Sequence, residues 1–270
     1  GGIILTTSIL KIIAVICMTL DHSQEIFPDF LPLAFSYAGR IAGPLFLFCF
    51  AEGMQHTRSR KKLMLRLYIA SLVTSVGNLL VSQYFLCDEY SIGNVLSTLF
   101  VIGIWICLWE KQYNSKIQKI CVLGGMFIIQ TVLGLGIIMA FIDNIEKNSL
   151  INLTATRMAA LSGVIPNYIC CESGIIWVAL GLAFYAFRGE KKKQCFCIAV
   201  YSTLMLIIGI VSEGVSSESL LSLNYQWMAI LTVPFLWIYN GERGKYHRQF
   251  YYGYYPIHLW VLYTIGCLMQ

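Results

Sequence analysis

Two side chains that could do chemistry together, Lys11 and His22, lie eleven residues apart in the first apolar stretch of the chain. In an α-helix of about 3.6 residues per turn, eleven residues make almost three full turns, so both side chains face the same way. At a rise of about 1.5 Å per residue they are separated by roughly 16 Å along the helix axis. A cation near one membrane surface and a buried imidazole suit a reaction between an anionic cytosolic donor and a second substrate. The alternative is a lysine that extends to the membrane surface and a histidine with a structural role.

Further ionisable residues lie at the same end of the first stretch and at the start of the second. Asp21 and Glu25 flank His22, and Arg40 opens the next stretch within the sequence Gly39-Arg40-Ile41-Ala42-Gly43. Because all three charged residues lie toward the same membrane surface, Arg40 is expected to pair with one of the two carboxylates. The spacing of Gly39 and Gly43 favours close approach of a neighbouring helix.

The opposite end of the second stretch carries Glu52 and His56 one helical turn apart, followed by Arg58 and Arg60. This cluster could bind the phosphates of a nucleotide-containing cofactor. It could equally be only the basic flank that marks the cytosolic end of a membrane span. In the last stretch, His258 follows a run of tyrosines, and an ionisable residue inside a membrane is a functional candidate.

The elements that must position these residues are membrane helices. The 270-residue chain is 57% hydrophobic and only 12% charged, whereas soluble domains are about 25% charged. About 20 mostly apolar residues are needed to cross the hydrocarbon core. Nine such stretches are present, at 9–28, 37–55, 63–83, 92–109, 119–141, 171–187, 195–211, 220–239 and 252–270. The sequence therefore predicts an all-α polytopic membrane protein with about nine transmembrane helices in a single domain, residues 1–270.

Residues 142–170 do not fit a simple alternation of spans and loops. Arg157, Pro166 and Asn167 lie there among apolar residues. The segment could lie along the membrane interface or re-enter the membrane from the outside. A tenth span is the alternative.

The basic residues alternate with acidic ones along the loops, which predicts the orientation of the chain. The basic clusters that follow the even-numbered stretches are Arg58 to Arg66, Lys111 to Lys119, Arg188 to Lys193 and Arg243 to Arg248, with Lys245 in the last. The acidic residues of the alternate loops are Asp21, Glu25, Asp29, Asp88, Glu89, Asp143, Glu146, Glu213 and Glu218. The positive-inside rule then places the N-terminus inside and the C-terminus outside. The net charge of +5 reports this topology and gives no reason to expect nucleic acid as a partner. The ten cysteines have no zinc-finger spacing, so no metal is predicted.

Several segments together resemble the TraX family. They are LKIIAVICMTLDH (10–22), GRIAGPLFLFCFAEGMQHTRSRKK (39–62), NVLSTLFVIG (94–103), ESGIIWVALGLAFYAFR (172–188), YNGERG (239–244) and YYPIHL (254–259). They occur in order along nearly the whole chain. The most specific parts are the Asp-His pair that closes the first stretch and the block from Gly39-Arg40 to His56-Thr57-Arg58.

The resemblance implies an activity and assigns roles to the candidates. The best-known member of the family acetylates the N-terminus of a conjugative pilin. The family in turn resembles the membrane acyltransferase type 3 superfamily, whose first span carries Arg or Lys, a ten-residue gap and His, the spacing of Lys11 and His22 here. That likeness implies an acyltransferase type 3-like helical bundle, acetyl-CoA as the cytosolic donor, and a bacterial inner (plasma) membrane location.

By the same resemblance, His22 would be the catalytic base, because a group that titrates near neutral pH suits removal of a nucleophile's proton. Asp21 would orient it, and Arg40 would stabilise the oxyanion or bind an acceptor carboxylate. The candidates for binding the phosphates of CoA are Lys11, His56, Arg58 and Arg60, and further candidate site residues are Glu25, Glu52 and His258.

The sequence leaves alternatives open for the acceptor of the acetyl group and for the class of protein. The family resemblance favours the N-terminal amine of a peptide or pilin-like protein, and the superfamily likeness leaves a hydroxyl of a glycan or lipid open. A transporter lined by Lys11, Asp21, His22 and Arg40 is a different class, although no internal repeat supports it. A membrane scaffold without enzyme activity is the third reading. Only the first class has a reason to bind acyl-CoA.

Overall fold

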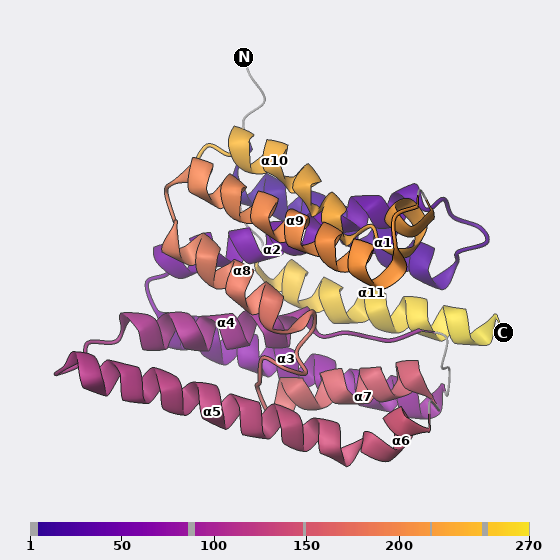
Figure 1. Cartoon of the computed structure of the whole chain (residues 1–270), viewed down its shortest axis with the longest axis horizontal. Helices are drawn as coiled ribbons and strands as arrows, with labels where there is room; N and C mark the ends of the chain where they lie inside the picture. Colours follow the sequence, from indigo (N-terminus) through magenta and orange to yellow (C-terminus); the bar gives the residue numbers. More distant parts are fainter. Residues whose placement is uncertain (1–4, 86–89, 148–149, 217, 245–247, 270) are drawn as a thin grey trace. The chain divides into compact units, whose positions relative to one another are not determined.

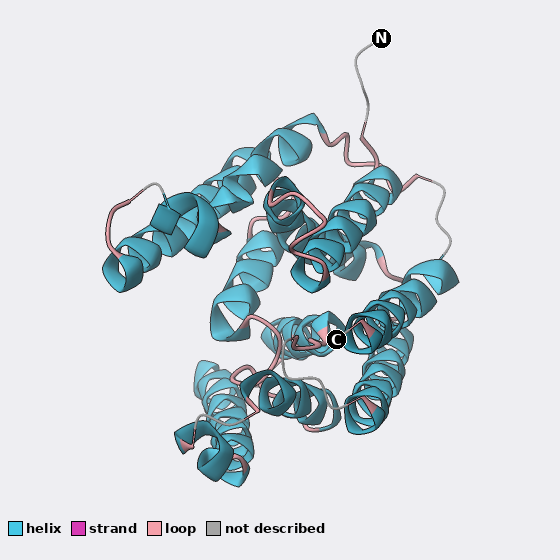
Figure 2. Ribbon diagram, turned by 90° about the vertical axis from the view of Figure 1, so that its right-hand side faces the viewer, coloured by secondary structure: helices cyan, strands magenta, loops and turns pink. Residues whose placement is uncertain are grey.

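Every regular element in the described part of the chain is a helix (Figure 2). The computed structural model describes residues 5–85, 90–147, 150–216, 218–244 and 248–269. Within these ranges the one β-type pairing is an isolated bridge between Leu5 and Tyr239. The prediction of an all-α chain is confirmed for these residues. Asp88, Glu89 and Lys245, which contributed to the charge pattern, lie outside them.

The helices follow the predicted stretches closely. They are α1 (Thr7–Ile26), α2 (Ala34–His56), α3 (Arg60–Tyr84), α4 (Val95–Glu110), α5 (Lys116–Ala140), α6 (Ile142–Glu146), α7 (Ile151–Val164), α8 (Gly174–Ala186), α9 (Lys191–Glu213), α10 (Val233–Ile238) and α11 (Arg248–Leu268), with a π-turn η1 (Ser219–Leu223) and a 3-10 helix η2 (Gln226–Thr232) before α10 (Figure 1). The stretch predicted at 220–239 is therefore not one α-helix but three short helical pieces.

Several apolar helices make this a membrane protein. Among the described residues, four helices are long and apolar enough to cross a bilayer: α2, α3, α5 and α9. Helix α5 shows why, because its side chains at Phe127, Ile128 and Ile129 are all exposed. In water this apolar surface would be costly, whereas lipid tails accept it.

The chain divides into two compact units. The first unit comprises residues 1–55 and 183–249, so it contains α1, most of α2, the last turn of α8, α9 and α10. Its core includes Phe48, which packs edge-on against the rings of Phe184 and Tyr239 at centroid distances of 5.8 and 5.2 Å.

The segment 239–244 of the first unit caps the N-terminus of α1. The N–H groups of Thr7 and Ser8 donate to the carbonyl oxygens of Glu242 and Arg243, at 2.9 and 3.1 Å. The first N–H groups of a helix have no partner within it, so these bonds anchor the start of α1. Gly244 has a positive φ of 68°, a conformation that favours glycine.

The second unit comprises residues 56–182 and 250–270 and is held together by polar contacts between small side chains. Helix α3 packs against α7 and α4. Asn94, which caps α4, is fully buried and donates to Ser71 and Ser75 of α3. A Cβ at Gly163 of α7 would collide with the Ser75 hydroxyl, so these helices approach as closely as small residues allow.

Candidate functional site

The face of α1 that carries Lys11 and His22 points into the protein. Both residues lie on the one continuous helix Thr7–Ile26, as their spacing predicted. Between them on the same stripe, Val15 and Met18 are buried, with 9% and 6% of their surface exposed. On the opposite face, Ile16 is 54% exposed. The prediction that Lys11 and His22 share one face of a helix is confirmed, and that face is the buried one.

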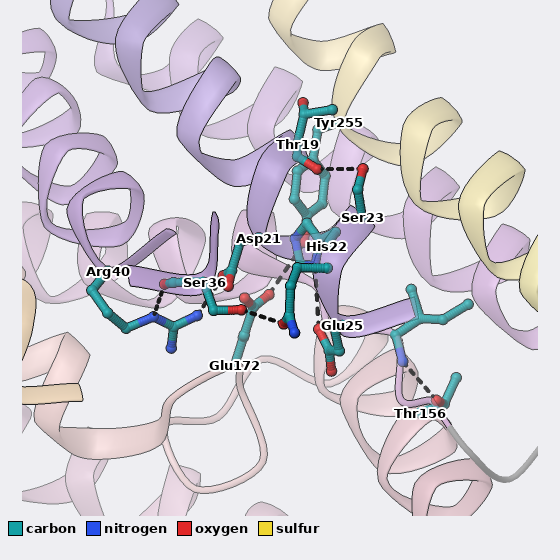
Figure 3. Close-up of polar contacts among 12 residues, drawn as sticks. Thr19, Asp21, His22, Ser23, Glu25, Ser36, Arg40, Thr156, Glu172 and Tyr255 are labelled. Atoms are coloured by element: carbon teal, nitrogen blue, oxygen red, sulfur yellow. Dashed lines mark hydrogen bonds and ion pairs between the residues drawn. The ribbon is translucent and has the colours of Figure 1, made fainter. Parts of the chain in front are cut away.

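The carboxylates on either side of His22 have different partners (Figure 3). Glu25 Oε2 lies 3.6 Å from His22 Nδ1, one turn along the helix. Asp21 Oδ2 instead forms an ion pair with the Nη2 atom of Arg40. The predicted pairing of Arg40 with an acidic residue of the first stretch is confirmed, and the partner is Asp21. The predicted orienting role of Asp21 toward His22 stays a prediction.

The Arg40 guanidinium connects three segments of the first unit. Its Nε donates to the carbonyl oxygen of Ser36 at 3.2 Å, and its Nη1 donates to Gln226 Oε1 at 2.8 Å. The guanidinium also lies over the ring of Tyr225, 5.3 Å from its centroid, a favourable cation–π distance. The fixed fork of a guanidinium suits several directed hydrogen bonds at once. Arg40 therefore holds α1 to α2 and to the start of η2, with Asp21 as the contact on α1.

Close packing of α1 and α2 places this ion pair. A Cβ at Gly39 would overlap with the side chain of Asp21. The glycine next to Arg40 thus leaves the space that the Asp21 carboxylate occupies. Ser36, one turn earlier, donates its hydroxyl to Gln24 Oε1 at 2.5 Å. The small residues of α2 bring both partners on α1 within reach, as the glycine spacing predicted.

The arrangement around His22 suits general base chemistry. A carboxylate near Nδ1 favours the tautomer that keeps a proton on that nitrogen, which leaves Nε2 as the basic atom. The side chains of Asp21 and Glu25 are 15% and 51% exposed, so the ion pair of Asp21 is better shielded from solvent. The His22 side chain is 23% exposed.

The other end of α1 carries a second polar group within the first unit. Glu52 is buried, and its Oε2 accepts from the hydroxyl of Tyr239 at 3.5 Å. The Tyr239 oxygen also lies 2.9 Å from Thr7 Oγ1, and Lys11 is one helical turn beyond Thr7. Lys191 donates its ammonium to the Tyr239 carbonyl oxygen. Sequence reasoning did not single out Tyr239, which is 187 residues from Glu52, although the segment YNGERG that begins with it was part of the family resemblance.

The remaining candidates lie in the second unit. His56 and Arg58 are exposed at the end of α2. Arg60, at the start of α3, forms an ion pair of 2.5 Å with Glu110 at the end of α4. His258 lies on α11, where its Nδ1 is 3.0 Å from the carbonyl oxygen of Tyr254. The structure thus brings Asp21, His22, Glu25 and Arg40 together in one unit with Lys11 and Glu52, and it describes the other four candidates in the other unit.

The structure adds partners that the sequence reasoning did not connect. Gln226 and Tyr225 are not among the candidate residues predicted from the sequence. Both contact Arg40. No three His, Cys, Asp or Glu side chains among the described residues are grouped so that they could hold a metal ion.

Comparisons with known proteins cover nearly the whole chain. The family model described as TraX protein matches residues 6–136 and 128–266, which include all ten candidate residues. The chain is 24% identical over 267 residues to a protein of Dichelobacter nodosus named "Probable fimbrial assembly protein FimC, serogroup H1", a match that spans 97% of this chain and 96% of that protein. No solved structure matches.

Proposed function

The chain belongs to the TraX family, and on this premise we propose that it is a membrane-embedded acetyltransferase that moves an acetyl group from cytosolic acetyl-CoA to an acceptor amine. One observation carries the proposal. On the buried face of α1, His22 has a carboxylate 3.6 Å from its Nδ1, next to an Asp21–Arg40 ion pair. In this proposal His22 is the base and the carboxylate near its Nδ1 orients it.

The proposed reaction is an acyl transfer with His22 as general base. The amine nitrogen attacks the carbonyl carbon of the thioester while His22 Nε2 accepts the amine proton. The tetrahedral intermediate then collapses, the carbon–sulfur bond breaks, and the CoA thiolate leaves and takes up a proton. A base of this kind typically contributes about 10²–10⁴-fold to the rate. Transfer through an acetyl-His22 intermediate is a second route with the same products.

The acceptor proposed is the N-terminal amine of a peptide or a pilin-like protein. The relative from Dichelobacter nodosus is named for fimbrial assembly, and fimbriae are polymers of protein subunits. A hydroxyl on a glycan or lipid would use the same base chemistry and is the alternative acceptor.

The donor would be bound through its phosphates by basic side chains at the cytosolic ends of the helices. Lys11, His56, Arg58 and Arg60 are the proposed contacts, because cationic side chains form strong hydrogen bonds to phosphate oxygens. We place the protein in a bacterial inner membrane with nine spans arranged as in the type 3 acyltransferases. The four apolar helices support a membrane location, and the alternating charge of the loops supports the orientation.

The deciding experiment measures acetyl-CoA binding and slow hydrolysis by the purified protein in detergent, with wild type beside His22→Gln. Binding retained with hydrolysis lost in the variant is the expected result. Binding and hydrolysis both unchanged in the variant would move the base elsewhere, and His258→Gln is the next variant to measure. A folded wild type that binds no acetyl-CoA would overturn the proposal in favour of a transporter or scaffold.

The two routes are separated by incubating the enzyme with tritiated acetyl-CoA and no acceptor. A label on the wild type that is absent from His22→Gln indicates an acetyl-enzyme. An unlabelled wild type that still transfers acetyl groups when acceptor is added indicates direct attack.

A further inference from the structure

The apolar segment 219–238 of the first unit is broken into short helical pieces, and the break reaches the guanidinium of Arg40. The segment starts as the π-turn η1, continues as the 3-10 helix η2 and ends as α10. Departures of this kind from α-helical geometry occur frequently at functional sites. Tyr225 and Gln226, where η1 passes into η2, both contact Arg40. The break thus places two side chains on a residue that is itself paired with Asp21.

Side chains hold the π-turn of this segment in place. The hydroxyl of Tyr37 on α2 donates to the carbonyl oxygen of Leu221 at 2.6 Å. Trp227 Nε1 donates to the carbonyl oxygen of Leu220 at 3.0 Å. Backbone acceptors outside an α-helix need such partners in a membrane protein. The ring of Tyr37 also lies against the ring of Tyr225, with centroids 5.5 Å apart, so the π-turn and the residues after it are attached to α2.

The neighbouring helix α9 fixes the same junction from another side. A Cβ at Gly209 of α9 would lie 2.3 Å from Asn224 Nδ2, so α9 approaches the junction as closely as a glycine allows. The N–H of Asn224 donates to the carbonyl oxygen of Ser219 at 2.8 Å and closes the π-turn. The backbone two residues before Gln226 is therefore held by packing and by hydrogen bonding, and the place of Gln226 follows from it.

Three hydrogen bonds fix the direction of the Arg40 guanidinium. Its Nε and Nη2 donate to the Ser36 carbonyl oxygen and to Asp21 (Figure 3), and its Nη1 donates to Gln226 Oε1 at 2.8 Å. A guanidinium has five N–H donors, of which these contacts use three, so roughly two are left for a ligand. Gln226 is a neutral acceptor and adds no second negative charge to that of Asp21. The guanidinium therefore keeps both donors and positive potential for a developing oxyanion.

We propose that Gln226, supported by the ring of Tyr225, is a positioning residue for Arg40. It holds the guanidinium in the direction that stabilises the oxyanion of the tetrahedral intermediate, and it acts through Arg40 without contacting the reacting atoms. The inference rests on the acetyl transfer proposed above. Without the Gln226 acceptor, the Nη1 end of the guanidinium loses its anchor, and the intermediate is less stabilised. Binding of acetyl-CoA is unaffected, because its proposed contact in this unit, Lys11, lies at the opposite end of α1.

The test is a double-mutant cycle on acetyl-CoA hydrolysis, measured for wild type, Gln226→Met, Arg40→Met and the double variant. Gln226→Met keeps the length of the side chain and removes the acceptor. It should lower kcat about tenfold, the size of one lost hydrogen bond to a charged group, with the KM for acetyl-CoA unchanged. Arg40→Met should lower kcat by about 10²-fold. In its background Gln226→Met should have no further effect, because Gln226 acts through Arg40.

The matched control is Gln83→Met, at an exposed position of α3, which should leave kcat unchanged in both backgrounds. The assay contains no acceptor substrate, so a loss of kcat reports on the oxyanion and not on the binding of an acceptor carboxylate. Thermal unfolding in the same detergent shows which variants are folded. A purely structural Gln226 would lower the unfolding midpoint and leave the kcat of the folded protein unchanged, and that result would overturn the proposal.

A second variant covers the case in which Gln226→Met does not fold. Tyr225→Leu removes the ring over the guanidinium and keeps Gln226, so kcat should fall several-fold in the wild-type background and not in Arg40→Met. Full kcat in the folded variant, or equal losses in both backgrounds, would contradict the positioning role. A wild type that hydrolyses no acetyl-CoA overturns the acetyl transfer itself and the role of Gln226 with it, so the two failures are distinct.

Discussion

At the scale of single residues, the structure separates two carboxylates that are four positions apart on α1. Glu25 lies near Nδ1 of His22, and Asp21 is bound to Arg40. Both acids and the base could be identified from the sequence. Which acid contacts His22 could not be predicted, because both lie close to it along the helix. Two residues of α2 determine the pairing. Gly39 leaves room for the Asp21 side chain, and Arg40 forms an ion pair with its carboxylate.

This division predicts different phenotypes for two matched amide variants. Glu25→Gln should lower kcat about 10–100-fold with an unchanged KM for acetyl-CoA, because His22 loses the acid that orients it. Asp21→Asn should instead lower the free energy of unfolding by about 1–3 kcal/mol, because the Arg40 guanidinium loses its charged partner. Steady-state kinetics and denaturant unfolding in detergent measure both effects. A kcat loss confined to Asp21→Asn, with normal stability, would make Asp21 the orienting acid.

At the scale of elements, the close approach of α1 to α2 depends on Gly39 but not on Gly53. Gly39→Ala places a methyl group where the Asp21 side chain lies, whereas a Cβ at Gly53 of the same helix meets nothing within 4 Å. Gly39→Ala should cost about 1–3 kcal/mol of stability, as overpacking does. Gly53→Ala should be neutral or stabilise by up to about 1 kcal/mol, because alanine is the better helix former. Similar unfolding midpoints for the two variants would contradict the close approach of the helices.

The N-cap of α4 should carry far more stability than the N-cap of α5. Asn94 is fully buried, accepts from the N–H of Ser97 and donates to Ser71 and Ser75. Ser115 caps α5 through one bond at an exposed position. Asn94→Ala should therefore cost about 2–4 kcal/mol, because buried groups lose their partners. Ser115→Ala should cost about 1 kcal/mol or less. Thermal unfolding of the two variants in the same detergent compares them, and equal losses would mean that the buried contacts of Asn94 contribute little.

The helical elements were predictable because their signal is local, and the exceptions mark where it fails. The stretch predicted at 119–141 is α5, Lys116–Ala140. Hydropathy could not show that 220–239 breaks into a π-turn, a 3-10 helix and α10, because all three are apolar. Tyr225 and Gln226, where the 3-10 helix begins, contact Arg40. The Tyr255–Glu172 bond joins residues 83 positions apart, and no periodicity within one helix can report it.

At the scale of the whole molecule, orientation in the membrane is a property of the loops and not of any one site. Each basic cluster follows an even-numbered stretch, and nine of the fourteen acidic residues lie in the alternate loops. Lys and Arg are retained on the cytosolic side, so this pattern predicts an odd number of crossings with the ends on opposite sides. If the orientation were reversed, Lys11 and the basic cluster after α2 would face away from the cytosolic pool of acetyl-CoA. The proposed function and the proposed topology thus constrain each other.

Reporter fusions test this topology directly. Alkaline phosphatase is active only outside the cytosol and green fluorescent protein folds only inside it, so each junction gives two opposite readings. Fusions at Gln112 and Gly189 should fluoresce, and fusions at Asp143 and after Gln270 should show phosphatase activity.

Comparing the fusion at Asp143 with the fusion at Gly189 also tests whether residues 142–170 cross the membrane. If this segment stays outside or re-enters, only α8 crosses between the two junctions, and they give opposite results. If it is a tenth span, two crossings separate the two junctions, and the junction at Gly189 lies outside. The basic cluster Arg188 to Lys193 would then be an exception to the positive-inside rule.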